Sequence, residues 1–207
     1  EDPQMASILT DAMAVGISGV DISDDDKKND FYLKTGLQSK HYAVYNSQWF
    51  RMSGSYNVSA RALHEFQLPT FLSQIKKGSV VGFMTSYGRT NGVPNGLSPN
   101  INIAKQEAPY SVLLFTDFGA PINVAAGFGN GVDRTYVPDN EHLSALYANI
   151  GSVKGVFNYE GKAGYPTKAQ TIDGIKRGLF GVNTSSLKEA VRPVLELWVR
   201  LGYFNEK

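Results

Sequence analysis

One aspartate stands at a position where catalytic carboxylates are often found. Asp117 follows a short apolar run at 111–115, whose β-branched and large side chains are typical of a strand buried on both faces. In a parallel α/β barrel the carboxyl ends of the strands form the catalytic face, so a carboxylate there can do chemistry. The same aspartate can instead cap the helix that the sequence predicts near Ala120. The spacing by itself leaves both roles open.

The elements that would position Asp117 alternate between strands and helices. Strands are predicted at 37–45, 79–84, 111–115 and 131–137. Helices are predicted at 3–20, 59–78, 120–127, 141–150, 168–178 and 185–201, the first with Asp2 as N-cap, the second kinked at Pro69. This order predicts an α/β fold in which residues 1–207 form the second half of a TIM-like (β/α)8 barrel, with parallel strands alternating with helices.

Composition narrows the classes of function. The 207 residues are 42% hydrophobic with a formal charge of +1, which fits one globular domain or a large piece of one. No basic cluster favours nucleic acid, and no apolar run approaches the roughly 20 residues of a membrane span. Cysteine is absent, which excludes disulfides and thiol catalysis. The acidic loop at 21–30 lacks the glycine and ligand spacing of a calcium loop, so we expect no metal and no organic cofactor.

The first residue is Glu1 rather than Met, so targeting cannot be judged from the sequence.

Several short motifs follow one another along the chain. They are Lys40-His41-Tyr42, Leu68-Pro-Thr-Phe71, Met84-Thr-Ser-Tyr87, Asn91-Gly-Val-Pro94, Thr116-Asp-Phe-Gly-Ala120, Gly131-Val-Asp133 and Arg200-Leu-Gly-Tyr-Phe204. Their order and spacing resemble those of the catalytic barrel domain of glycoside hydrolase family three, the β-glucosidase and β-xylosidase group. The resemblance implies a retaining β-glycosidase in which Asp117 attacks the anomeric carbon and forms a covalent glycosyl-enzyme.

The resemblance also implies roles for other residues. Lys40 and His41 would hydrogen-bond sugar hydroxyls, which suits an ammonium with three donors and an imidazole that can donate or accept. Arg51 would line the sugar pocket, Tyr87 would donate a hydrogen bond near the nucleophile, and Met84 and Phe118 would form apolar walls of the pocket. Each has a plain structural alternative: a satisfied core histidine for His41, a surface arginine for Arg51, and ordinary barrel packing for Met84 and Tyr87.

Some positions depart from the family's usual pattern. Phe118 stands where tryptophan is usual, Gly88 where asparagine is common, and Ala108-Pro-Tyr110 replaces a Trp-Gly-Phe approach to the nucleophile strand. The loop at 44–48 has no histidine, which argues against the N-acetylhexosaminidase subgroup. These changes predict a divergent branch.

The resemblance covers only the later part of the barrel domain. We therefore expect the remaining barrel half, and a domain that carries the acid/base glutamate, to act as partners in the same or another chain. The substrate would be a β-linked oligosaccharide or glycoside. Two other functions stay open: a non-catalytic relative that binds carbohydrate or serves as a scaffold, and a different barrel enzyme in which Asp117 is a metal ligand or proton acceptor.

Overall fold

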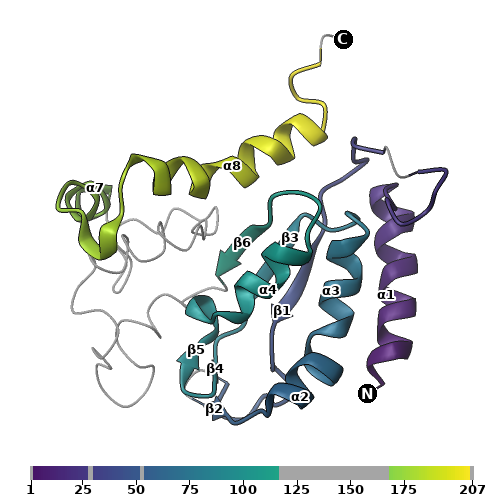
Figure 1. The fold of residues 1–207 in the computed structure, drawn as a ribbon, viewed down its shortest axis with the longest axis horizontal. Helices are drawn as coiled ribbons and strands as arrows, with labels where there is room; N and C mark the ends of the chain where they lie inside the picture. The colour runs from purple at the N-terminus through teal and green to yellow at the C-terminus, as the bar shows by residue number, and fades with distance from the viewer. Residues whose placement is uncertain (1, 28–29, 52–53, 117–167, 206–207) are drawn as a thin grey trace.

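The computed structural model describes residues 2–27, 30–51, 54–116 and 168–205. These residues form a mixed helix and sheet structure around three parallel strands, β1 (Gln38–Tyr42), β3 (Gly82–Thr85) and β6 (Leu113–Thr116). The longer helices are α1 (Pro3–Ser18), α3 (Pro69–Lys76), α4 (Asn100–Glu107), α7 (Lys168–Lys176) and α8 (Thr184–Arg200) (Figure 1). The predicted α/β class with parallel strands and helices is therefore observed.

The parallel sheet has the order β1-β3-β6, which follows the order of the strands along the chain. Gly82 to Thr85 pair with Leu113 to Thr116 without a break. The pairing of β1 with β3 is regular up to Lys40 and Met84 and then shifts, so that Tyr42 is the register partner of Thr85 and the register skips His41. All three strands therefore end at the same edge, and an irregularity at His41 lies close to that edge.

Apolar side chains alternate between the two faces of the sheet, as the pleat of a strand requires. Phe83 and Leu114 belong to a core that contains buried residues of α3 and α4, such as Ile75 and Ile101. A second core lies on the other face of the sheet. It contains Val81, Leu113 and the half-buried Phe115, which pack against Val194 and Leu197 of α8. Helices thus cover both faces of the sheet, which explains why β3 and β6 read as short apolar runs.

Helix α1 begins as its sequence predicts but exposes its apolar stripe. The Asp2 carboxylate accepts hydrogen bonds from the backbone N–H groups of Gln4 and Met5, and Pro3 is the first helical residue. The helix packs on α3 through small and polar side chains, and Ser73 donates a hydrogen bond to Asp11. The larger apolar side chains of the stripe face solvent, at exposed fractions of 59–61%: Met5, Ile8, Leu9 and Met13.

The predicted second helix is interrupted rather than kinked. Ser59 caps a short α2 (Ala60–Ala62), which continues into a π-helical turn, η1 (Leu63–Gln67). The N–H of Leu68 bonds to the carbonyl of Leu63, and Pro69 then opens α3. Proline has no N–H to donate, and its ring would clash with the carbonyl group four residues earlier in a continuous helix. A new helix therefore starts at Pro69. Gly78 ends α3 with a positive φ of 68°, as predicted.

Helical spacing predicts a buried stripe in two of these helices, and the predicted burial is wrong at several positions. The stripe residues are Leu63, Phe66, Leu68, Phe71, Leu72 and Ile75 in the helix at 59–78, and Leu187, Val191, Val194, Leu195, Leu197 and Val199 in the helix at 185–201. Phe66 is 45% exposed, whereas Leu63, Leu68 and Ile75 of the same predicted stripe are buried. In α8 the side chains of Val191, Leu195 and Val199 face solvent, while Val194 and Leu197 pack against the sheet. The π-helical turn rotates Phe66 away from the core. In α8, the side that carries Val194 and Leu197 packs against the described strands, and the side that carries Val191, Leu195 and Val199 does not.

Helix α8 is attached to the amino ends of the strands by two ionisable side chains. The Glu196 carboxylate accepts the backbone N–H of Ser111, just before β6, at 2.9 Å. Arg200 is 2% exposed and donates to the carbonyls of Phe31 and Gly78, each at 3.1 Å. Its guanidinium lies 3.9 Å from the centroid of the Tyr110 ring. Burial lowers the pKa of this guanidinium, while Tyr110 and Glu196 offset part of that effect.

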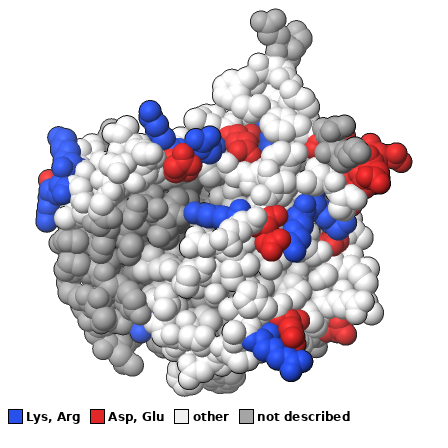
Figure 2. Space-filling view, viewed as in Figure 1, with Lys and Arg blue, Asp and Glu red and all other residues white. Residues whose placement is uncertain are grey.

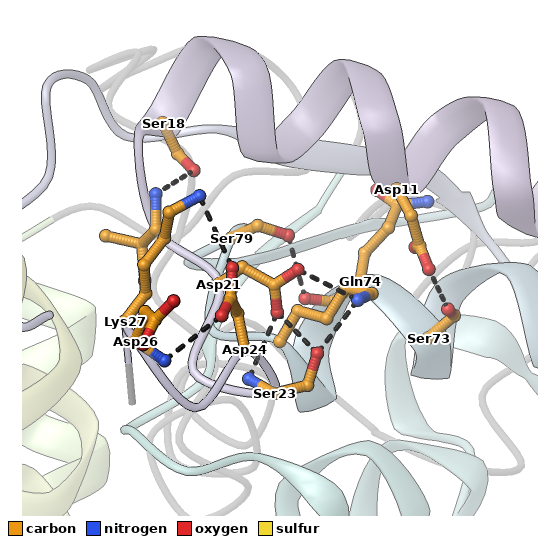
Figure 3. A network of polar contacts seen from close by, with 12 residues as sticks. Asp11, Ser18, Asp21, Ser23, Asp24, Asp26, Lys27, Ser73, Gln74 and Ser79 are labelled. Carbon is orange, nitrogen blue, oxygen red and sulfur yellow. Dashed lines mark hydrogen bonds and ion pairs between the residues drawn. The ribbon is translucent and has the colours of Figure 1, made fainter. Parts of the chain in front are cut away.

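A second set of polar contacts connects the turn after α1 with the end of α3 (Figure 3). The Asp21 carboxylate accepts hydrogen bonds from Ser23 and, at 3.0 Å, from the ammonium of Lys77. Burial alone would raise the pKa of Asp21, but the hydrogen bonds from Ser23 and Lys77 outweigh it and hold the pKa below its usual range. The acidic loop is therefore a structural turn.

Other predicted elements begin or end at different residues in the structure, and some fall outside the described residues. The strands begin up to three residues later than predicted, at Gln38, Gly82 and Leu113. Helix α4 was missed, and the loop predicted after β3 contains the two-residue strands β4 (Arg89–Thr90) and β5 (Val93–Pro94) and the 3-10 turn η2 (Asn95–Leu97). These strands form a small sheet with β2 (Ser55–Tyr56). The elements predicted at 120–127, 131–137 and 141–150 lie outside the described residues.

Charged side chains are dispersed over the surface. Figure 2 shows acidic and basic side chains in small mixed groups, separated by uncharged areas, on the described part of the viewed face. Among the described helices, none combines the length and apolar character needed to cross a bilayer.

Candidate active site

The carboxyl ends of the three parallel strands bring the candidate residues to one edge of the sheet (Figure 1). Tyr42 and Thr85 are register partners, as are Thr85 and Thr116, so the last residues of β1, β3 and β6 lie side by side. Asp117 is the next residue after Thr116 in the sequence. Asp117 and Phe118 themselves lie outside the described residues.

Lys40 and Met84 are neighbours across two strands. They are register partners in β1 and β3, and paired residues on adjacent strands project on the same side of a sheet. Lys40 is exposed and Met84 is half-buried. The pair therefore places an ammonium beside a thioether, one group able to donate hydrogen bonds and one apolar.

An aromatic residue that the sequence analysis did not single out, Tyr45, connects His41 with Arg51, and Arg51 in turn contacts Tyr87. The ring centroids of His41 and Tyr45 are 5.0 Å apart. Arg51 donates from Nη1 to the Tyr45 hydroxyl at 3.3 Å, and its Cζ lies 5.4 Å from the centroid of the Tyr87 ring. The Tyr45 hydroxyl in turn donates to Gln48 at 3.0 Å. The structure thus gathers three predicted residues into one cluster around Tyr45.

Tyr45 is a candidate that sequence reasoning missed. It follows β1 in an irregular segment, where no hydrophobic period marks its neighbours. Its one signal was its type, since tyrosine has an apolar ring and a polar hydroxyl and often contacts ligands with both. Arg51 lies ten positions after His41 in the sequence, and Tyr87 lies farther along still, so no local pattern connects these residues.

A hollow of about 340 Å³ opens beside the end of β1. It is bounded by the start of α1, the end of β1 with the segment after it, and the stretch from η1 into α3. Its side chains include a cation, an imidazole, a phenol and two aromatic rings: Lys40, His41, Tyr45, Phe66 and Phe71. Polar groups beside aromatic rings suit a carbohydrate, which presents hydroxyls at its rim and C–H groups on its faces.

Metal chemistry finds no support in the described ranges. No group of three or more His, Asp or Glu side chains is close enough there to hold an ion. The cluster described above offers hydrogen-bond donors, acceptors and rings instead.

The chain resembles known proteins both in sequence and in fold. No protein-family profile matches the chain. A β-glucosidase from Kluyveromyces marxianus is 28% identical over 135 residues, which are 64% of this chain and 14% of that protein. The solved β-glucosidase from Listeria innocua superposes on the whole chain with a TM-score of 0.73 at 20% identity. A solved GH3 exo-β-xylosidase, XlnD, superposes on 92% of the chain with a TM-score of 0.70, also at 20% identity. The resemblance to glycoside hydrolase family three is confirmed.

The family-three resemblance extends over a limited part of each larger protein. The chain corresponds to 26% of the Listeria innocua structure and 23% of the XlnD structure. It therefore spans about a quarter of the length of those solved relatives. The activities named for those relatives belong to the whole of these longer proteins.

Proposed function

We propose that the protein containing this chain is a retaining β-glycosidase. It would remove terminal β-linked glucose or xylose residues, with Asp117 as the nucleophile that forms a covalent glycosyl-enzyme. The observation that carries this proposal is the cluster of His41, Tyr45, Arg51 and Tyr87 at the carboxyl edge of the sheet, next to the strand that leads into Asp117. The names of the similar proteins support the choice of β-glucosides and β-xylosides.

The geometry suits sugar binding by several groups at once. A pyranoside needs donors and acceptors around its ring, and the cluster supplies an imidazole, a guanidinium and two phenols from two segments of the chain. Lys40 lies on β1, with β3 between it and the strand that leads to Asp117, and its ammonium would favour the ionised form of a carboxylate brought near it. An ionised carboxylate is what a retaining glycosidase needs for its first step.

The exposed apolar faces of α1 and α8 support the proposal that further structural elements pack against this chain. Four large side chains of α1 are 59–61% exposed, and Val191, Leu195 and Val199 face solvent on α8. Contiguous apolar faces on a protein surface commonly mark contact with other structure. We propose that the other half of a (β/α)8 barrel packs there, and that a further domain brings the acid/base carboxylate into place, about 5 Å from Asp117.

Hydrolysis of aryl glycosides tests the proposed function. The full-length protein and its Asp117→Asn variant are assayed with p-nitrophenyl β-glucoside and β-xyloside, and proton NMR records the anomer released first. The proposal predicts release of the β-anomer and a loss of at least 1,000-fold in kcat for Asp117→Asn, because an amide cannot attack the anomeric carbon. Asp26→Asn, an equal change in the exposed loop after α1, is the control and keeps full activity.

Other outcomes would redirect the proposal. Release of the α-anomer, or full activity of Asp117→Asn, contradicts it. A folded full-length protein that hydrolyses neither glycoside but binds glucose in calorimetry would favour the non-catalytic carbohydrate-binding alternative.

A further inference from the structure

The segment that follows β1 has an unusual backbone. Val44 has a φ of 57°, in the left-handed region that a β-branched residue rarely adopts, and its side chain is buried. Such a conformation persists only where the surrounding structure holds it. Val44 directly precedes Tyr45, the residue that contacts both His41 and Arg51. Whatever holds Val44 therefore also sets the position of Tyr45.

A buried asparagine and a neighbouring serine hold this segment through hydrogen bonds. Asn95 is 3% exposed, and its Nδ2 donates to the carbonyl of Ala43 at 3.0 Å and to the Ser86 hydroxyl at 2.6 Å. Its Oδ1 accepts the Thr90 hydroxyl at 2.7 Å. Ser86 adds two bonds of its own, from its hydroxyl to the Ala43 carbonyl and from its N–H to the Tyr42 carbonyl, each at 2.9 Å.

These bonds connect two loops of the candidate site. Ala43 lies between His41 and Tyr45 on the first loop, and Ser86 lies next to Tyr87 on the second. Asn95 bonds to both, and it is itself fixed by its own N–H, which donates to the Gly88 carbonyl at 2.9 Å. A buried amide whose donors and acceptor are all used strongly resists displacement.

We propose that Asn95 is a positioning residue of the active site. Its side-chain amide holds Ala43 and Val44 in the conformation that places Tyr45 between His41 and Arg51, and it sets the distance from that group to Tyr87. This inference rests on the proposed function for its kinetic consequence, while the positioning itself is independent of catalysis.

Asparagine is suited to this place because it donates and accepts from one planar group. Aspartate has nearly the same shape but only accepts when ionised, so Asn95→Asp sets a carboxylate oxygen against the carbonyl of Ala43. Asn91, in the same loop, is the matched control. Its amide bonds to the N–H and carbonyl of Val58 at 2.8 and 2.9 Å, on an exposed surface away from Ala43.

Hydrogen exchange tests the positioning directly. In the full-length protein, Asn95→Asp should speed amide exchange at least tenfold in peptides that cover residues 42–48, and Asn91→Asp should leave these peptides unchanged. Thr90→Val removes only the hydroxyl bond to Asn95 and serves if Asn95→Asp does not fold; it should give a smaller acceleration at the same peptides. Unchanged exchange at 42–48 in a folded Asn95→Asp or Thr90→Val protein overturns the inference.

Kinetics test whether the positioning reaches the site through Tyr45. Asn95→Asp and Tyr45→Phe should each lower kcat/KM about tenfold, and the double variant should lose much less than the 100-fold product of the two. Losses that multiply would show that Asn95 acts elsewhere and would overturn the route through Tyr45. If the unaltered protein hydrolyses no β-glycoside, the proposed function fails, and the exchange experiment still decides on Asn95.

Discussion

The guanidinium of Arg51 lies over the ring of Tyr87, with its Cζ 5.4 Å from the ring centroid. The two residues belong to separate loops, one after β1 and one after β3, so their contact closes the candidate site across the edge of the sheet. A cation over an aromatic face is stabilised by the ring's quadrupole, which favours one relative placement of the two loops.

Replacing Arg51 should therefore affect catalysis more than folding. Arg51→Met removes the guanidinium from Tyr87 and the hydrogen bond to Tyr45. We expect kcat/KM for p-nitrophenyl β-glucoside to fall roughly 10- to 100-fold in the full-length protein, with little change in melting temperature. Arg61→Met is the control, because among the described residues Arg61 forms an exposed pair with Glu65 on α2 and η1, away from the candidate site. Equal kinetics for both variants would contradict a role of Arg51 at the site.

Gly82 allows the close approach of β3 and β6. A Cβ on Gly82 would lie 1.8 Å from the carbonyl oxygen of Leu113, which no relaxation of a side chain can relieve. Gly82→Ala should cost about 3 kcal/mol or more in the free energy of unfolding, since backbone must move.

The control for Gly82 is a glycine with open space around it. Gly16 lies in α1, where a Cβ meets no atom within 4 Å. Gly16→Ala should stabilise by about 0.5–1 kcal/mol, because alanine loses less backbone freedom in a helix. Thermal unfolding of the two variants should shift the transition in opposite directions. A neutral Gly82→Ala would contradict the observed spacing of the strands.

The ion pair of Asp21 and Lys77 predicts a pH dependence of stability. The folded-state pKa of Asp21 is lowered, so the stabilisation is present above the unfolded pKa near 3.8 and is lost as the pH falls through the folded pKa. Lys77→Met should lower stability at pH 7 by about 1 kcal/mol, and this difference should shrink at pH 3.

A neighbouring lysine serves as the control for this measurement. Lys76 pairs with Glu107 at the surface, with about half of its own side chain exposed, so Lys76→Met should have a smaller effect at both pH values. Thermal unfolding at pH 7 and pH 3 gives the comparison. A deficit of Lys77→Met that stays constant between the two pH values would contradict the assigned cause.

Local signals in the sequence predicted much of the fold. Asp2 caps α1 as expected, and Ser59, one of two caps predicted for the second helix with Asn57, caps α2, because a cap depends only on residues two or three positions away. Strands β3 and β6 were found as short apolar runs with starts predicted too early, because residues such as Val81 are buried just before the first register pair. Helix α4 was missed because its eight residues carry a weak apolar period.

Long-range contacts in the site were not predictable in the same way. Asn95 bonds to a carbonyl 52 positions earlier in the chain, and no local pattern records such a partner. The exposure of Met5 and Leu9 on α1 likewise depends on which surfaces lie beside the helix, which periodicity does not show. The motif around Lys40 and His41 was recognisable, but its connection to Arg51 and Tyr87 through Tyr45 required coordinates.

A covalent label on Asp117 tests the central claim most directly. A 2-deoxy-2-fluoro β-glucoside with a good leaving group forms a glycosyl-enzyme that breaks down slowly, because the fluorine destabilises the transition state for hydrolysis. Intact mass of the full-length protein should increase by one fluorosugar, and peptide mapping should place the adduct on Asp117. The Asp117→Asn variant should remain unlabelled. An adduct on another carboxylate, or no adduct with the glucose and xylose reagents on an active protein, would contradict the account.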